Sequence, residues 1–214
     1  MKSTVIFDLD GTLIDTEKYF KVFWQKAAEK NGYAMSEEQA LQLRSLGRPY
    51  APELLKKWFG ADFDYIKVRD DRREMMQEHL QKVGLERKPG AKQALEQLKK
   101  QGCRIALATA TPRERAKAQL EQVGLLTYFD EIVSAVQVER GKPAPDVYLY
   151  ACEKLGIKPQ EAYAVEDSPN GAMSAITAGL KVIFVPDQTQ PDAELSERIY
   201  ACIPNLSQLV EVVE

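Results

Sequence analysis

The chain has 214 residues, of which 44% are hydrophobic and 29% charged, and its formal net charge is −3. This composition is ordinary for a globular protein, and the small negative charge predicts neither a nucleic-acid nor a membrane partner. The sequence shows no basic-then-apolar leader, and no apolar run approaches the ~18 residues of a membrane span. We therefore expect a cytoplasmic protein.

The first predicted element is a short buried strand at Val5-Ile6-Phe7, because three consecutive apolar residues suit a strand covered on both faces. Asp8 and Asp10 follow it directly, and Gly11 suits a tight turn. Two carboxylates at the mouth of a buried strand repel each other and are poorly solvated. The pattern favours a cation beside them, and capping of a turn is the alternative.

From residue 15 to about residue 84 the sequence shows only helical periodicity. Phe20, Phe23 and Trp24 share one face of a first helix, which Asn31-Gly32 ends, and their spacing indicates a bundle core rather than a sugar platform. Three further helices are predicted, at 36–43, 52–58 and 64–83. We expect a small helical bundle inserted after the first strand.

The remaining chain alternates strands with helices. Strands are predicted at 104–108, 131–134, 162–165 and 181–185, and helices at 89–100, 112–124, 145–155 and 169–178. This rhythm predicts an α/β fold, a Rossmann-like parallel sheet with helices on both faces. Residues 1–14 and 85–214 would form this core, and residues 15–84 the helical cap.

Polar residues follow three of the predicted strands. Asp8 and Asp10 follow the first, Thr109 the second, and Glu166-Asp167 the strand at 162–165. The carboxyl ends of parallel strands share one rim, where ligands bind at a reversal of strand order. If the first strand lies between the other two, these groups meet in one crevice.

These residues resemble the motifs of the haloacid dehalogenase-like phosphotransferase superfamily, in particular its β-phosphoglucomutase-like branch, which has a helical cap after the first strand. The resemblance covers essentially the whole chain. The four motifs appear in order as Asp8-Leu9-Asp10-Gly11-Thr12, Thr109, Lys142 between Gly141 and Pro143, and Glu166-Asp167.

The resemblance implies a role for each of the acids. Asp8 would be the nucleophile that forms an aspartyl-phosphate, and Asp10 would be the general acid and base. Mg2+ would be held by Asp8, the backbone carbonyl of Asp10 and Asp167, because hard oxygen ligands suit this ion. Glu166 would bind the metal directly or through water.

Phosphate contacts are implied for three further residues. Thr109 and the neighbouring backbone at Ala110 lie near a predicted helix start, which favours phosphate oxygens. Lys142, in a stiff turn, would neutralise charge shared between Asp8 and the transferring phosphate.

The cap residues Arg44 and Arg48 are candidate substrate contacts. Arg48 matches an arginine that holds a second phosphate in the mutases, and a surface salt bridge is the competing interpretation. The mutases also carry a histidine near positions 19 and 20. This chain has its single histidine at His79, which we expect to be a solvated surface residue.

The sequence therefore predicts a Mg2+-dependent phosphatase that hydrolyses a small phosphorylated metabolite, such as a sugar phosphate. A hexose phosphate mutase and a non-catalytic phosphometabolite sensor are the alternatives. The expected partner is a small-molecule phosphate monoester, and the expected state is a monomer, with a dimer as the alternative.

Overall fold

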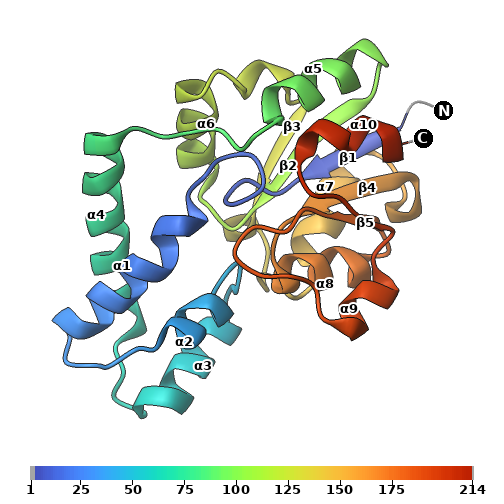
Figure 1. The fold of residues 1–214 in the computed structure, drawn as a ribbon. Helices are drawn as coiled ribbons and strands as arrows, with labels where there is room; N and C mark the ends of the chain where they lie inside the picture. The colour runs from blue at the N-terminus through green and yellow to red at the C-terminus, as the bar shows by residue number, and fades with distance from the viewer. Residues whose placement is uncertain (1–2, 214) are drawn as a thin grey trace.

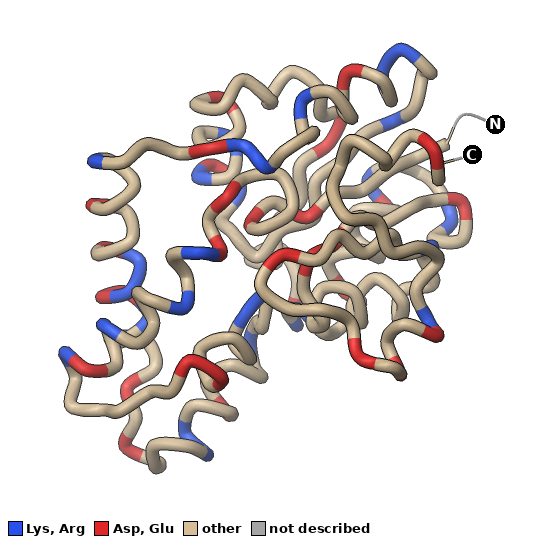
Figure 2. Tube along the Cα trace, in the orientation of Figure 1, with Lys and Arg blue, Asp and Glu red and all other residues tan. Residues whose placement is uncertain are grey.

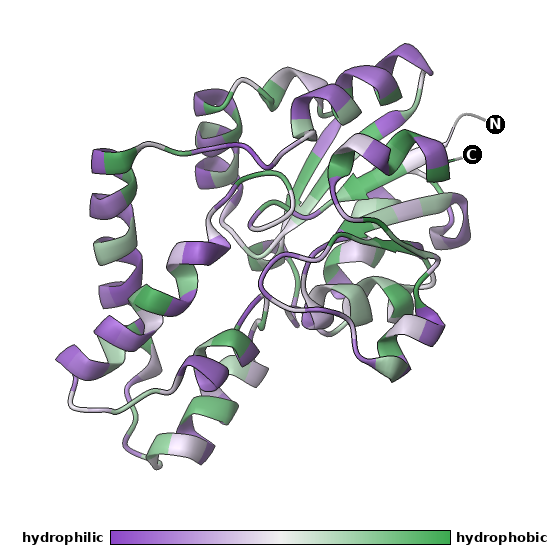
Figure 3. Cartoon of the chain, in the orientation of Figure 1, coloured by the Kyte–Doolittle hydropathy of each residue, from purple (hydrophilic) through white to green (hydrophobic). Residues whose placement is uncertain are grey.

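The computed structural model describes residues 3–213 and contains a six-stranded parallel sheet in the order β3-β2-β1-β4-β5-β6 (Figure 1). The strands are β1 (Thr4–Phe7), β2 (Arg104–Thr109), β3 (Glu131–Ser134), β4 (Ala162–Glu166), β5 (Lys181–Phe184) and β6 (Ala201–Cys202). The central strands are strongly apolar (Figure 3), as expected for strands buried on both faces. The predicted α/β fold is confirmed.

Each face of the sheet has its own hydrophobic layer. Side chains of β1 alternate between them, so that Val5 and Phe7 join one layer and Ile6 the other. The first layer also contains residues of α5 (Ala91–Lys100), α6 (Arg113–Gln122) and α10 (Leu209–Val212). The second contains residues of α7 (Asp146–Leu155), α8 (Pro169–Ala178) and α9 (Ala193–Arg198).

Four helices follow β1 before the chain returns to the sheet: α1 (Glu17–Lys30), α2 (Glu37–Gln42), α3 (Tyr50–Phe59) and α4 (Tyr65–Val83). They lie to one side of the sheet (Figure 1) and share a hydrophobic cluster centred on residues such as Trp24, Leu43 and Leu55. Ser36 begins α2 with a capping box, since its side chain accepts from the Gln39 N–H. We refer to α1–α4 and their connections as the cap, and to the rest as the core.

The predicted strands and helices all appear, with ends shifted by a few residues. The structure adds β6, α9, α10 and four 3₁₀ helices, at Leu126–Tyr128, Ala135–Gln137, Pro159–Glu161 and Leu206–Gln208. Within residues 3–213, no helix combines the length and the apolar character needed to cross a bilayer.

Candidate active site

The sheet topology brings the predicted acids together. Because β1 lies between β2 and β4, Asp8 emerges beside Glu166, the last residue of β4, and beside Asp167. One carboxylate oxygen from each of these three buried residues lies within 4.8 Å of the others. The expected convergence at one rim of the sheet is therefore observed.

Lys142 joins two of these carboxylates. Its Nζ lies 2.5 Å from Asp8 Oδ1 and 2.6 Å from Glu166 Oε1. Burial opposes the ammonium charge, but the two carboxylates outweigh burial and raise the pKa of Lys142 above its ordinary value. Lys142 thus remains charged against Asp8, the residue predicted to accept phosphorus.

Tyr148 of α7 contacts both Glu166 and Lys142. Its hydroxyl donates a 2.5 Å hydrogen bond to Glu166 Oε1, and its ring centroid lies 5.2 Å from Lys142 Nζ. The side chain is fully buried, so these contacts leave it little freedom. Tyr148 therefore fixes the positions of Glu166 and Lys142.

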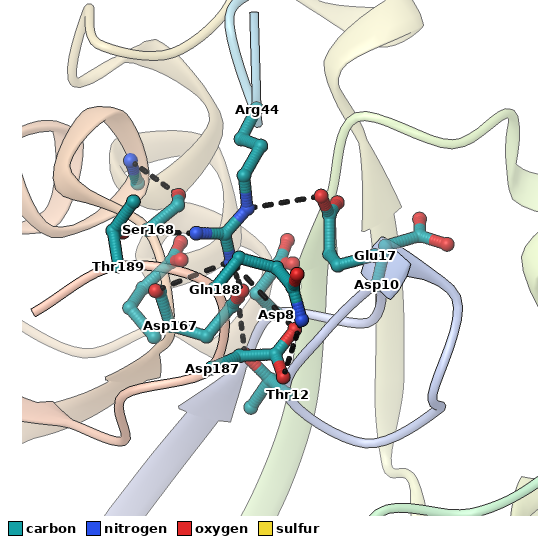
Figure 4. Close-up of polar contacts among 12 residues, drawn as sticks. Asp8, Asp10, Thr12, Glu17, Arg44, Asp167, Ser168, Asp187, Gln188 and Thr189 are labelled. Atoms are coloured by element: carbon teal, nitrogen blue, oxygen red, sulfur yellow. Dashed lines mark hydrogen bonds and ion pairs between the residues drawn. The ribbon is translucent and has the colours of Figure 1, made fainter. Parts of the chain in front are cut away.

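Arg44 reaches from the cap to the opposite side of the acid cluster (Figure 4). Its guanidinium is 1% exposed, pairs with Asp167, and donates to Glu17 Oε2 at 3.0 Å and to Thr189 Oγ1 at 2.9 Å. Thr12 Oγ1 donates to the other oxygen of Asp167 at 2.9 Å. Although Arg44 was expected to contact substrate, its guanidinium pairs with Glu17 of the cap and Asp167 of the core, and Arg44 is not among the residues that line the cavity between cap and core.

The acid cluster has the properties of a divalent-cation site. Burial, followed by the charge of Asp8 among other groups, raises the pKa of Asp167 to about 7 and that of Glu166 to about 8, against the opposing effects of Arg44 and Lys142. Glu166 Oε2 is buried and has no hydrogen-bond partner among the described residues. Three converging carboxylates, with Glu166 Oε2 free to act as a ligand, fit Mg2+. Asp8 and Asp167 would hold the ion, with Glu166 adjacent.

Asp10 lies outside this cluster but beside it. Its Oδ1 accepts from Thr16 Oγ1 and its Oδ2 from Thr111 Oγ1, each at 2.8 Å. The carboxylate lines a cavity together with Asp8. Two hydroxyl donors therefore hold the Asp10 carboxylate at the wall of this cavity.

The loop after β2 lies on the other side of this cavity. Thr109 is buried and its Oγ1 accepts from the Thr111 backbone N–H at 3.0 Å, whereas Ala110 is exposed and lines the cavity. The backbone at Ala110 and Thr111 therefore borders the space above Asp8. This position suits the proposed phosphate contact.

The cavity has a volume of about 350 Å³ and lies between cap and core. This size suits a small metabolite. Phe20 and Trp24 of α1 contribute to its wall, although both also pack in the cap cluster. Arg48 lines the cavity and forms no ion pair among the described residues, so the surface salt bridge considered for it is absent there.

His79 differs from its expected position. Its ring lies 4.6 Å from that of Tyr19 and 5.3 Å from that of Phe23, and its Nε2 is buried. The prediction of a solvated surface residue is wrong, because Tyr19 and Phe23 of α1 pack against this side chain of α4. His79 is not among the residues that line the cavity.

Several residues near the acids were not predicted from the sequence, among them Glu17, Tyr148 and Asp187. Glu17 lies in the first turn of α1, where the helix dipole favours an acidic residue. An acid at this position therefore does not by itself indicate a functional site. Tyr148 resembles an ordinary core position of α7. Asp187 pairs with Lys88 at 2.8 Å and follows β5 at the same rim of the sheet as the other acids. Its position after a predicted strand could have identified it from the sequence.

Comparisons with known proteins agree with this geometry. The family model described as haloacid dehalogenase-like hydrolase matches residues 5–185. The chain is 32% identical over 184 residues to the phosphorylated carbohydrates phosphatase of Thermotoga maritima, covering 84% of this chain and 83% of the relative. It is 34% identical over 180 residues to hexitol phosphatase A of Escherichia coli, covering 84% and 81%.

A solved structure, the β-phosphoglucomutase of Clostridium difficile, superposes with a TM-score of 0.82 over 98% of this chain and 93% of that one. At 22% identity this likeness shows the fold. The chain belongs to the haloacid dehalogenase-like hydrolase family. Its relatives include phosphatases and phosphoglucomutases.

Proposed function

We propose that the protein is a Mg2+-dependent phosphatase that hydrolyses small phosphorylated sugars or similar metabolites through an aspartyl-phosphate on Asp8. The observation that supports this most directly is the position of Asp8. Its carboxylate is buried at the end of the central strand, paired with Lys142, beside Asp167 and at the base of the cavity.

In the first step, an oxygen of Asp8 attacks phosphorus and the bond from phosphorus to the leaving oxygen breaks. Asp10 gives its proton to that oxygen, and the alcohol departs. Lys142 remains protonated and offsets negative charge between Asp8 and the phosphoryl oxygens. Thr16 and Thr111 keep Asp10 oriented throughout.

In the second step, water attacks phosphorus while Asp10 takes up its proton, which releases phosphate and regenerates the Asp8 carboxylate. Mg2+, when bound by Asp8, the backbone carbonyl of Asp10 and Asp167, would offset charge on the transferring group. Closure of the cap over the cavity would exclude water until the alcohol has left.

The mutase alternative has less support. A mutase must return the phosphoryl group to the sugar, and the proton-delivering histidine expected near positions 19 and 20 is replaced by Tyr19 and Phe20. His79 of α4 packs against Tyr19 and Phe23 of α1 and is absent from the cavity lining. The known family fold alone does not favour transfer over hydrolysis.

The test is phosphate release from p-nitrophenyl phosphate and from a panel of sugar phosphates, with Mg2+ and with a chelator. Asp8→Asn should lower kcat by about a thousandfold or more, as expected for loss of a nucleophile. Asp62→Asn, in an exposed cap loop, is the matched control and should keep wild-type turnover.

Each alternative gives a different result in this assay. Ligand binding without turnover of any monoester would indicate the sensor. Activation by a sugar bisphosphate, with recovery of an isomeric sugar phosphate instead of free phosphate, would indicate the mutase.

A further inference from the structure

Arginines are prominent in the cavity wall, although the chain has a formal net charge of −3. Its lining residues include the five arginines Arg48, Arg69, Arg72, Arg73 and Arg115. Four carboxylates line the same cavity, those of Asp8, Asp10, Glu17 and Glu139. These arginines are additional to Lys142, which pairs with Asp8. The cavity wall therefore has positive side chains beyond the one proposed to contact the transferring phosphate.

Three of these arginines come from one face of α4. The residues of α4 that line the cavity are Tyr65, Arg69, Arg72, Arg73 and Met76. Their spacing of three, four and seven residues places them on one side of a helix. Charged residues of both signs occur along α4 (Figure 2), but its cavity face carries only the positive ones.

Arg72 is held in place without a counter-charge. Its guanidinium carbon lies 4.9 Å from the ring centroid of Phe20 and 5.4 Å from that of Trp24, and its Nη1 lies 3.7 Å from Met76 Sδ. Its Nε is buried with no hydrogen-bond partner, and no described carboxylate forms an ion pair with it. Aromatic rings thus orient a cation whose donors are still available.

The neighbours of Arg72 differ in how far they are neutralised. Arg69 and Arg73 both pair with Asp70, at 2.8 Å and 3.6 Å. Arg115, which comes from α6 of the core, has no ion pair or hydrogen bond among the described residues. Burial, followed by repulsion from Arg73 and Arg115, lowers the pKa of Arg72 to about 10.

We propose that Arg72 of the cap and Arg115 of the core bind a second anionic group of the substrate, a phosphate or a carboxylate. The preferred substrates are then phosphorylated sugars that carry a second negative charge distant from the phosphate that is hydrolysed. Because the two arginines belong to different parts of the chain, such a substrate also draws the cap onto the core. This inference rests on the proposed function.

Three probes with the same C6 phosphate test the proposal. Position C1 carries a neutral hydroxyl in glucose 6-phosphate, a carboxylate in 6-phosphogluconate and a phosphate in glucose 1,6-bisphosphate. We expect kcat/KM to be higher by about tenfold or more for an anionic C1 group, the size expected for a charge-assisted hydrogen bond. The carboxylate and phosphate probes separate the two kinds of anion.

Arg72→Met and Arg115→Met should each remove most of this preference and leave glucose 6-phosphate hydrolysis close to wild type. The methionine at position 72 keeps apolar contact with Phe20 and Trp24. Arg72→Lys retains the charge and should restore part of the preference. Lys67→Met removes an exposed cation of α4 that does not line this cavity, and is the matched control.

Equal kcat/KM for all three probes in the wild type would overturn the second anion site and leave the phosphatase proposal standing. An equal loss for all three probes in Arg72→Met would also overturn it, since the residue would then be structural. If neither these probes nor any monoester of the wider panel is hydrolysed, the proposed function fails. Calorimetric titration of the same probes into the wild type and Arg72→Met then decides the anion site, and equal affinities would refute it.

Discussion

Gly47 of the cap and Gly141 of the core are in backbone contact, and a Cβ added at Gly47 would lie 2.6 Å from Gly141 Cα. Two hydrogen bonds flank the contact, from Gly47 N–H to Lys142 O at 2.8 Å and from Gly141 N–H to Arg48 O at 2.7 Å. The cap therefore rests directly on the loop that carries Lys142. The position of the cap and the placement of Lys142 are coupled through these two glycines.

Gly47→Ala should lower kcat/KM by about tenfold or more, because a misplacement of roughly 1 Å at an active site can cost about a hundredfold. The new methyl group meets backbone atoms, which cannot rotate away. Gly141→Ala should act in the same way, since its Cβ would lie 2.7 Å from Gly47 Cα. Steady-state kinetics of both variants measure the effect.

The double variant provides the control for this contact. Residues that act through one contact are not additive, so the double variant should lose little more activity than either single one. Full additivity of the two losses would show that the glycines act separately.

Lys142→Met should abolish phosphate release and lower the free energy of unfolding by about 3–5 kcal/mol, because Asp8 and Glu166 would be left buried without their cation. Tyr148→Phe removes only the hydroxyl bonded to Glu166 and should cost about 1–3 kcal/mol. Urea unfolding and the phosphatase assay measure both variants. A Lys142→Met protein with wild-type turnover would contradict the role assigned to this lysine.

Mg2+ at about a hundredfold its dissociation constant should stabilise the protein by about 2.7 kcal/mol, which raises Tm by roughly 5–10 °C for a chain of this size. The reason is that the ion relieves repulsion among Asp8, Glu166 and Asp167. Thermal unfolding with Mg2+ and with a chelator measures the shift. Asp167→Asn should greatly reduce it, and an unchanged shift in that variant would place the ion elsewhere.

The stability of the metal-free protein should fall as pH rises from about 5 to 8. The pKa values of Asp167, about 7, and of Glu166, about 8, lie above the roughly 4 of unfolded carboxyl groups. A raised carboxyl pKa contributes stability at low pH, and this contribution is lost as pH rises through the folded-state value. Glu166→Gln should lose less stability over this range, as measured by chemical denaturation at each pH.

The increase in Tm caused by Mg2+ should become larger as pH rises, whereas the stability of the metal-free protein should fall. Protons and the cation compete for the same carboxylates, so the gain from Mg2+ should be larger at pH 8 than at pH 5.5. A gain that does not vary with pH would mean that these carboxylates are already ionised in the metal-free protein.

The sequence predicted the strands of the sheet well because buried parallel strands are apolar runs bounded by turns, as in Val5-Ile6-Phe7. It also predicted the cap helices from their periodicity and from Ser36, whose capping box the structure contains. The two-residue strand β6 was missed, since Ala201 and Cys202 have too little length to form a pattern. Its pairing depends on the position of β5.

The residues of the site could be predicted only where they occur in the order of the family motifs. Asp8, Lys142 and the pair Glu166-Asp167 occur in a recognisable succession, and the structure brings their side chains together. Arg44 was predicted to contact substrate because it lies in the cap. The structure instead pairs it with Asp167 of the core, and this pairing depends on the position of the cap relative to the core. Such contacts across 123 residues have no local signature.

The first strand of the sheet in chain order, β1, lies in the middle of the sheet. Both neighbours of β1 are encoded much later, β2 at Arg104–Thr109 and β4 at Ala162–Glu166. A polypeptide that leaves the ribosome prematurely, or is cleaved anywhere before β4, therefore contains Asp8 without Glu166 and Asp167. An N-terminal fragment that ends before β4 thus cannot assemble the cluster of Asp8, Glu166 and Asp167, and the proposed function predicts no phosphate release from it.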